Sequence, residues 1–200
     1  MDGLGRLDTD TLVDSSQATA AAFDYGYDGL ADGEGAVTGP VRTNLRVLKP
    51  SRKAPRDGDV FVMQLPDDRY VFGRVMSTEA MAGASMPGAI LIYVYRPRFD
   101  STGLPERSEL SRERLLVPPM MTNRLPWSKG YFETVAHWPL EPDDMLPQHC
   151  FLSAARGRYF DEKGNELPGP IEPVGDYGLH SYRTIDDAVS ASLGFDRAPD

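Results

Sequence analysis

Four side chains with the chemistry of zinc ligands lie in the second half of the chain, but their spacing does not favour a metal site. They are His137, His149, Cys150 and His180. Structural zinc sites usually draw pairs of ligands from spacings such as C-x-x-C or H-x-x-x-H, and no pair here has either. The sequence therefore predicts neither a metal site nor a cofactor. Cys150 precedes Phe151 and Leu152, so we interpret it as a buried side chain rather than a nucleophile.

Carboxylates are the second group that could do chemistry, and two short segments concentrate them. Asp67 and Asp68 follow Pro66 in an expected turn, and the acidic residues at 141, 143 and 144 follow Pro139. Paired carboxylates act as general acid and base only where a cleft raises the pKa of one of them. The G-x-S-x-G, G-x-x-x-x-G-K-[ST] and G-x-G-x-x-G motifs do not occur. We therefore predict no catalytic residues and no enzymatic activity.

The same segments could bind a partner protein. Trp127 and Tyr131 flank an expected turn at Gly130, and exposed aromatic side chains on loops often anchor interfaces. Alternatively, both rings close the edge of the core. The candidates for partner binding are Asp67, Asp68, Trp127, Tyr131, Glu141, Asp143 and Asp144.

Charge is distributed unevenly along the chain, which has 21 Lys and Arg, 30 Asp and Glu, and a net charge of -9. Residues 1–40 carry eight acids and one base, and residues 41–56 carry six bases and no acid. Nucleic-acid binding needs clustered cations, so we expect no nucleic-acid partner and no anionic membrane surface. The apolar run at 89–95 is too short to span a bilayer, and residues 1–17 do not resemble a secretory signal. A single cysteine also fits a reducing compartment, so we expect a cytoplasmic protein.

These shifts in composition predict two regions. Residues 1–56 form a flexible extension, acidic and then basic, in which large apolar side chains are too few to offset the cost of ordering the backbone. Residues 57–200 form a single β-rich domain, which is long enough to bury a core of its own.

Apolar alternation predicts the elements that position the candidate residues. Residues 60–65 and 70–76 read as a hairpin, in which Gly73 marks a bulge or tight bend. Residues 89–96 are apolar on both faces and read as a central strand. A final helix is expected to have Thr184 as its N-cap and to end at Gly194. The predicted fold class is α+β, mainly β: a strongly bent antiparallel sheet or partly open small barrel with one or two short helices.

The hairpin resembles the opening of the immunity protein 26 family. The residues concerned are G-D-V-F at 58–61 and L-P-D-D-R-Y-V-F-G-R-V at 65–75. Later parts of the family pattern correspond to residues 90–95, Trp127 with Gly130, and Trp138 followed by Pro139 and Leu140. The resemblance spans residues 57–182, with Asp68 where the family often has glycine. It implies a bacterial protein of a polymorphic-toxin system that binds and neutralises a cognate toxin, without a catalytic motif.

Three hypotheses for function follow. The first is an immunity protein that presents an acidic surface to its toxin, since negative potential speeds encounter with a basic partner. The second is a small-barrel ribonuclease-type toxin, with Arg74, Arg96 and Arg98 forming a phosphate site. The third is a non-catalytic scaffold module. The sequence leaves the oligomeric state open.

Overall fold

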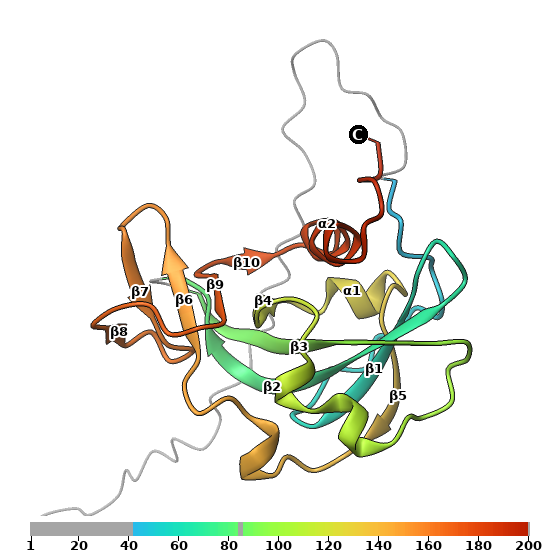
Figure 1. Cartoon of the computed structure of the whole chain (residues 1–200), viewed down its shortest axis with the longest axis horizontal. Coiled ribbons are helices and arrows are strands. Elements are labelled where there is room, and N and C mark those ends of the chain that lie inside the picture. The colour runs from blue at the N-terminus through green and yellow to red at the C-terminus, as the bar shows by residue number, and fades with distance from the viewer. Residues whose placement is uncertain (1–41, 84–85, 200) are drawn as a thin grey trace, which may run out of the picture. The chain divides into compact units, whose positions relative to one another are not determined.

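Two β-sheets make up most of the structure, a computed structural model that describes residues 42–83 and 86–199. The strands are β1 (Asp59–Gln64), β2 (Tyr70–Met81), β3 (Pro87–Phe99), β4 (Met120–Thr122), β5 (Glu133–His137), β6 (Cys150–Ser153), β7 (Arg158–Phe160), β8 (Glu166–Leu167), β9 (Val174–Asp176) and β10 (Leu179–His180). The larger sheet has the order β10-β4-β3-β2-β1-β5, and the smaller sheet has the order β8-β7-β6-β9. The smaller sheet lies beside the β10 end of the larger one (Figure 1).

Short helical segments connect the strands. The 3₁₀ turns are η1 (Arg107–Leu110), η2 (Arg112–Arg114) and η3 (Pro142–Asp144), and the α-helices are α1 (Leu125–Ser128) and α2 (Tyr182–Leu193). The predicted fold class is confirmed, because the fold is α+β and mainly β and its sheets do not close into a barrel. None of the helices in the described residues is both long and apolar enough to cross a membrane.

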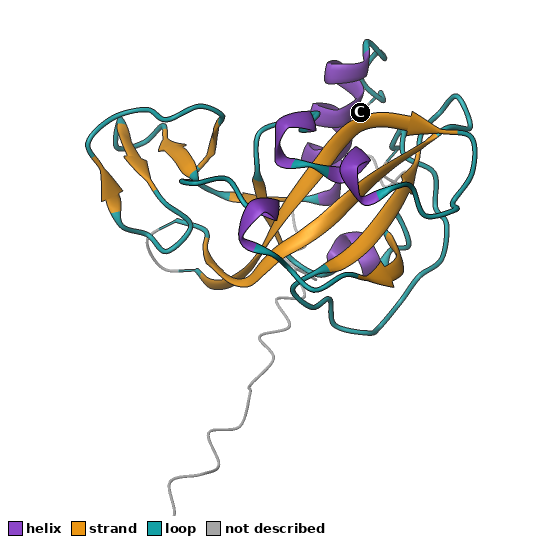
Figure 2. Ribbon diagram, turned by 60° about the horizontal axis from the view of Figure 1, so that its bottom comes forward, coloured by secondary structure: helices purple, strands orange, loops and turns teal. Residues whose placement is uncertain are grey.

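The long strands of the larger sheet run side by side (Figure 2), and side chains on both faces of this sheet are buried. One face carries Phe61, Val75 and Val94 and is covered by Trp127 of α1 and by apolar residues of α2. The opposite face carries Phe72, Leu91 and Tyr93 and is covered by Leu110 and Phe151. Two-sided burial explains why β3 is apolar at successive positions, and its predicted central place is confirmed by its neighbours β2 and β4.

Gly73 sits where the hairpin strands pass the aromatic core. The register of β2 against β3 shifts between Val71 and Gly73, which confirms the predicted bulge. A Cβ atom at Gly73 would collide with the Phe61 ring and lie 2.6 Å from the carbonyl oxygen of Tyr93. A side chain at this position therefore cannot be accommodated without moving the core.

We expect Gly73→Ala to lower the free energy of unfolding by about 1–3 kcal/mol, because overpacking forces the Phe61 ring or the β3 backbone to shift. Urea unfolding followed by tryptophan fluorescence measures the change. Gly103→Ala is the matched control, since a Cβ there meets only the Ser101 hydroxyl at 3.4 Å on an exposed loop. Equal stability of the two variants would contradict the close approach.

Several elements differ from their predicted form. Helix α2 begins at Tyr182 rather than after Thr184, because the Ser181 side chain caps it by accepting the Thr184 N–H at 3.2 Å. The predicted C-terminal stop is confirmed, since Gly194 has φ 79°. Strand β4 is an inner strand of the larger sheet, because it pairs antiparallel with β3 on one side and parallel with β10 on the other.

Residues 42–56, assigned from sequence to the flexible extension, lie against the domain. Leu45 is 3% exposed and belongs to the core. The carboxylate of Asp186 on α2 accepts the N–H groups of Asn44 at 2.9 Å and Leu45 at 2.8 Å. The Arg46 N–H donates to the Gln64 carbonyl at 3.0 Å. We call residues 42–56 the strap; the rest of the predicted extension, residues 1–41, falls outside the described residues, and the domain boundary at residue 57 stays a prediction.

Candidate functional site

The acidic residues after Pro139 form one tight turn, η3, between β5 and β6. We call residues 141–144 the acidic turn. Its first and last residues form a capping box: the Glu141 side chain accepts the Asp144 N–H, and Asp144 Oδ2 accepts the Glu141 N–H at 2.8 Å. Pro142 occupies the first position of the turn, where its fixed φ is favourable. The local sequence therefore fixes the backbone of the turn.

Asp144 anchors the turn to the larger sheet through Arg74 of β2. Asp144 Oδ1 lies 2.8 Å from Arg74 Nη1, and the Arg74 side chain is 0% exposed. Arg74 Nη2 also donates to the Trp138 carbonyl at 3.2 Å, and its guanidinium carbon lies 5.9 Å from the centre of the Trp138 ring. Burial alone would raise the pKa of Asp144, but hydrogen bonds from Arg74, the Glu141 amide and Arg107 hold that pKa below its ordinary value.

Two arginines from the 3₁₀ segments hold the turn from its outer side. Arg107 Nη2 donates to Asp144 Oδ2 at 2.7 Å and lies 3.2 Å from Glu141 Oε1. Arg112 Nη1 donates to the Met145 carbonyl at 2.7 Å. The Asp143 side chain is nevertheless 100% exposed, and that of Glu141 is 66% exposed. The structure thus presents two accessible carboxylates on a rigid backbone.

The other predicted acidic pair lies elsewhere. The end of β5 lies beside the start of β1, because His137 pairs with Asp59. The acidic turn follows β5 and therefore lies near the start of β1. Asp67 and Asp68 instead follow the far end of β1, where Asp67 Oδ2 lies 3.4 Å from Arg98 Nη1 and Asp68 Oδ1 lies 2.8 Å from Arg46 Nη1. The two groups of candidate carboxylates therefore occupy opposite ends of β1.

The aromatic candidates lie in or against the core. Trp127 is 1% exposed, packs edge-on against Phe61 and Phe132, and donates from Nε1 to Thr134 Oγ1 at 3.2 Å. Of the two readings left open for this ring, the structure therefore favours closure of the core. Tyr131 is half-buried and stacks on Tyr182 with ring centres 5.0 Å apart.

A second buried network, which sequence reasoning missed, joins the two sheets. Glu162 Oε2 lies 3.0 Å from His149 Nδ1, and His149 Nε2 lies 2.5 Å from the Tyr93 hydroxyl. The Leu146 N–H donates to the same hydroxyl at 3.0 Å. A carboxylate only accepts, so His149 Nδ1 donates to Glu162, and His149 Nε2 forms the hydrogen bond with the Tyr93 hydroxyl. We call Tyr93, His149 and Glu162 the relay.

The relay has the same sequence of hydrogen-bonded groups as a catalytic carboxylate–histidine–hydroxyl triad, but its hydroxyl is not accessible to solvent. Tyr93 is 0% exposed and His149 is 2% exposed, so no substrate reaches the hydroxyl. Each member lies on or beside a different strand: β3 carries Tyr93, His149 precedes β6, and Glu162 follows β7. The relay therefore acts as a polar cross-link between the sheets. Tyr93, His149 and Glu162 lie far apart in the sequence, so no local sequence motif predicts that they meet.

The relay makes part of the stability depend on pH. The hydrogen bond from His149 lowers the pKa of Glu162 despite opposing burial. Because the folded pKa lies below that of the unfolded chain, this stabilisation is present above the ordinary glutamate pKa and is lost as the pH falls through the folded pKa. We expect Glu162→Gln to be less stable than the parent protein at neutral pH, with the gap closing in acid.

Urea unfolding at a series of pH values from about 7 to 3.5 measures this gap. Glu79→Gln, on an exposed position of β2, is the matched control and should show no gap that changes with pH. A Glu162→Gln deficit that stays constant over the whole range would contradict a charged role for Glu162 in the relay.

The zinc-type side chains do not gather in the part of the chain that the structure describes. No three or more His, Cys, Asp or Glu side chains among these residues are placed to hold a metal ion. His137 Nδ1 lies 3.1 Å from Asp59 Oδ1, His149 belongs to the relay, and Cys150 is buried.

The arginines of the ribonuclease hypothesis have other partners. Arg74 is buried beneath the acidic turn, Arg98 pairs with Asp67, and Arg96 donates to the Leu115 carbonyl at 3.3 Å. With Arg74 inaccessible and held by a carboxylate, the structure does not support it as a phosphate ligand.

The fold and the acidic turn define a mainly β protein in which arginine side chains hold an exposed acidic turn. The model of the immunity protein 26 family matches residues 56–161, just over half of the chain. The chain therefore belongs to this family, and the resemblance noted at the hairpin is confirmed. A search of curated proteins found no significant match, and neither did a search of solved structures. The match contains the acidic turn and the relay's Tyr93 and His149, whereas α2 lies beyond it.

Proposed function

We propose that this immunity protein binds a cognate protein toxin and neutralises it without catalysis, with the acidic turn as the centre of the contact. The observation that carries the proposal is the pair of exposed carboxylates, Glu141 and Asp143, on a backbone fixed by Arg74, Arg107 and Arg112. Such preorganisation reduces the ordering cost of binding. Membership of the family supports the role.

The distribution of charge favours a local contact over a uniformly acidic domain. The described residues carry 20 Lys and Arg against 21 Asp and Glu, and six of these bases lie in the strap. Most of the net charge of -9 comes from residues 1–41. We therefore propose the acidic turn, rather than the whole surface, as the feature that is complementary to a basic region of the toxin.

The remaining predicted residues have smaller parts in this proposal. Asp67 and Asp68 lie at the other end of β1, so they contribute only if the toxin extends along the sheet. Trp127 supports the fold from the core, and Tyr131 stays a candidate at the rim. We also propose that binding takes place in the cytoplasm, as the single cysteine suggests, and that residues 57–200 with the packed strap form the binding unit.

Gel filtration of the purified full chain with the toxin encoded beside its gene tests the proposal. We expect a complex that elutes ahead of either protein and that weakens as the salt concentration rises, since screening acts on exposed charges. Separate elution of the two folded proteins at low salt would contradict it.

A further inference from the structure

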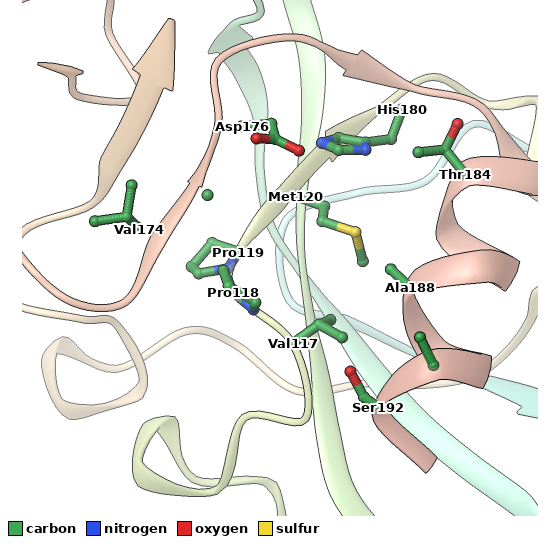
Figure 3. Close-up of a pocket in the computed structure, with 12 residues that line it drawn as sticks. Val117, Pro118, Pro119, Met120, Val174, Asp176, His180, Thr184, Ala188 and Ser192 are labelled. Atoms are coloured by element: carbon green, nitrogen blue, oxygen red, sulfur yellow. The ribbon is translucent and has the colours of Figure 1, made fainter. Parts of the chain in front are cut away.

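An apolar pocket lies between α2, β9 and the segment that leads into β4 (Figure 3). Its volume is about 320 Å³. Its walls come from apolar side chains of three segments: Val117, Pro118, Pro119, Met120, Val174, Ala188 and Ala191. Figure 3 shows the His180 ring pointing toward Asp176 at one end, with Ser192 at the other. The pocket thus combines an apolar body with one polar end.

His180 carries an acceptor that has no donor. The residue is 8% exposed, and its Nε2 atom is buried without a hydrogen-bond partner. The ring donates to the Asp176 backbone, and because Nε2 has no partner, the donating atom is Nδ1. Burial lowers the pKa of His180 in spite of the nearby Asp176 carboxylate, so the ring is neutral at neutral pH. The Nε2 lone pair is then a buried, unused acceptor on a side chain that lines the pocket.

This combination defines the chemistry of a ligand. Ligand pockets are mostly apolar with a few polar groups that set orientation, and this one is at the small end of the usual range. Because His180 Nε2 is an unused acceptor, a ligand that satisfies it carries one O–H or N–H donor. The nearby Asp176 carboxylate disfavours a negatively charged ligand. Met120, an unbranched side chain that can change its rotamers, also lines the pocket and can move to admit a ring.

We propose that this pocket binds an aromatic ring carrying one hydrogen-bond donor, a phenol or an indole, with its donor directed at His180 Nε2. The ring comes either from a free small molecule or from an exposed tyrosine or tryptophan of a protein. This site is separate from the acidic turn, because α2 packs on one face of the larger sheet and Met145 and Leu146, which follow the turn, pack on the other.

Titration of the ¹⁵N-labelled full chain with p-cresol, followed by NMR, tests the proposal. We expect saturable shifts of the His180 ring nitrogens and of amides in the pocket, and binding about 10-fold weaker for toluene, which lacks the donor. N-acetyltyrosinamide separates the sources: if it also binds, a protein side chain fits the site, and if only p-cresol binds, the ligand is a free small molecule. Either result supports the pocket, whereas p-cresol shifts absent at millimolar concentration, or shifts no larger than those of toluene, would overturn it.

Two variants locate the binding. His180→Phe should remove the preference for p-cresol over toluene. Ala191→Phe, at an exposed position of α2, should fill the pocket and abolish binding even if His180→Phe does not fold. Ala154→Phe, on the exposed β6–β7 turn, is the matched control. Binding that survives unchanged in Ala191→Phe would overturn the proposal. Binding that survives in the double variant Glu141→Lys with Asp143→Lys would support a pocket that does not depend on the acidic turn.

Discussion

Arg74→Ala is expected to lower the free energy of unfolding by about 3–5 kcal/mol, because it leaves the carboxylate of Asp144 without its buried partner. The Asp144 side chain is only 12% exposed, so water replaces the lost guanidinium poorly. The substitution also removes a fully buried long side chain that packs over the Trp138 ring. The acidic turn would then lose its attachment to β2.

Urea unfolding at neutral pH measures this loss. Arg158→Ala is the matched control, since Arg158 forms an exposed pair with Glu166 and should change stability by less than about 1 kcal/mol. A double-mutant cycle with Asp144→Ala isolates the pair itself, because both single variants remove the same contact. If Arg74→Ala cost no more than Arg158→Ala, the anchoring of the turn would be contradicted.

Reversing the exposed charges of the acidic turn is expected to weaken toxin binding by about 100-fold or more. The double variant Glu141→Lys with Asp143→Lys changes two side chains that are largely solvent-exposed and retains Asp144. The fold should lose one cap and two weak exposed pairs, Arg107 with Glu141 and Arg112 with Asp143, at a cost of about 1 kcal/mol. The large effect on binding therefore comes from placing two cations against a basic region of the toxin.

Surface plasmon resonance at several salt concentrations measures the association and dissociation rates of the toxin complex separately. Most of the loss at low salt should appear in the association rate, because exposed charges steer encounter. The variant Glu79→Lys with Asp100→Lys makes the same change in net charge at exposed positions outside the turn and should bind nearly as the parent protein does. Equal weakening in both double variants would show that only net charge matters.

The elements that could be predicted from the sequence are those built from local patterns. The hairpin of β1 and β2 follows from alternation and a Pro-Asp turn, and β3 is apolar on both faces, as a central strand must be. The end of α2 follows from Gly194. Its start does not, because both Ser181 and Thr184 are good caps and only the hydrogen bond from the Thr184 N–H selects Ser181.

The chemistry of the site depended on contacts between distant residues, which local patterns do not carry. The sequence around Arg74 on β2 does not distinguish a phosphate ligand from a buried ion pair, because its partner Asp144 lies 70 positions further along the chain. The acidic turn itself was evident from its composition, whereas its support was not. The relay is similar, since His149 and Tyr93 are 56 positions apart.

Trp127 illustrates an ambiguity that the sequence could not resolve. A tryptophan beside a glycine turn suits both an interface and a core edge, and its neighbours Phe61 and Phe132 are brought together only by the pairing of β1 with β5. The strap is the reverse case. From its composition it is assigned to a flexible extension, yet the buried Leu45 side chain and the hydrogen bonds to the Asp186 carboxylate hold its first residues against the domain.

Survival of cells that produce the toxin tests the role of this chain most directly. Co-expression of the full chain with the toxin encoded beside it should restore growth, and the variant carrying Glu141→Lys and Asp143→Lys, at the same soluble level, should not. Failure of the parent chain to protect, or equal protection by the variant, would contradict an immunity protein that works by binding through the acidic turn.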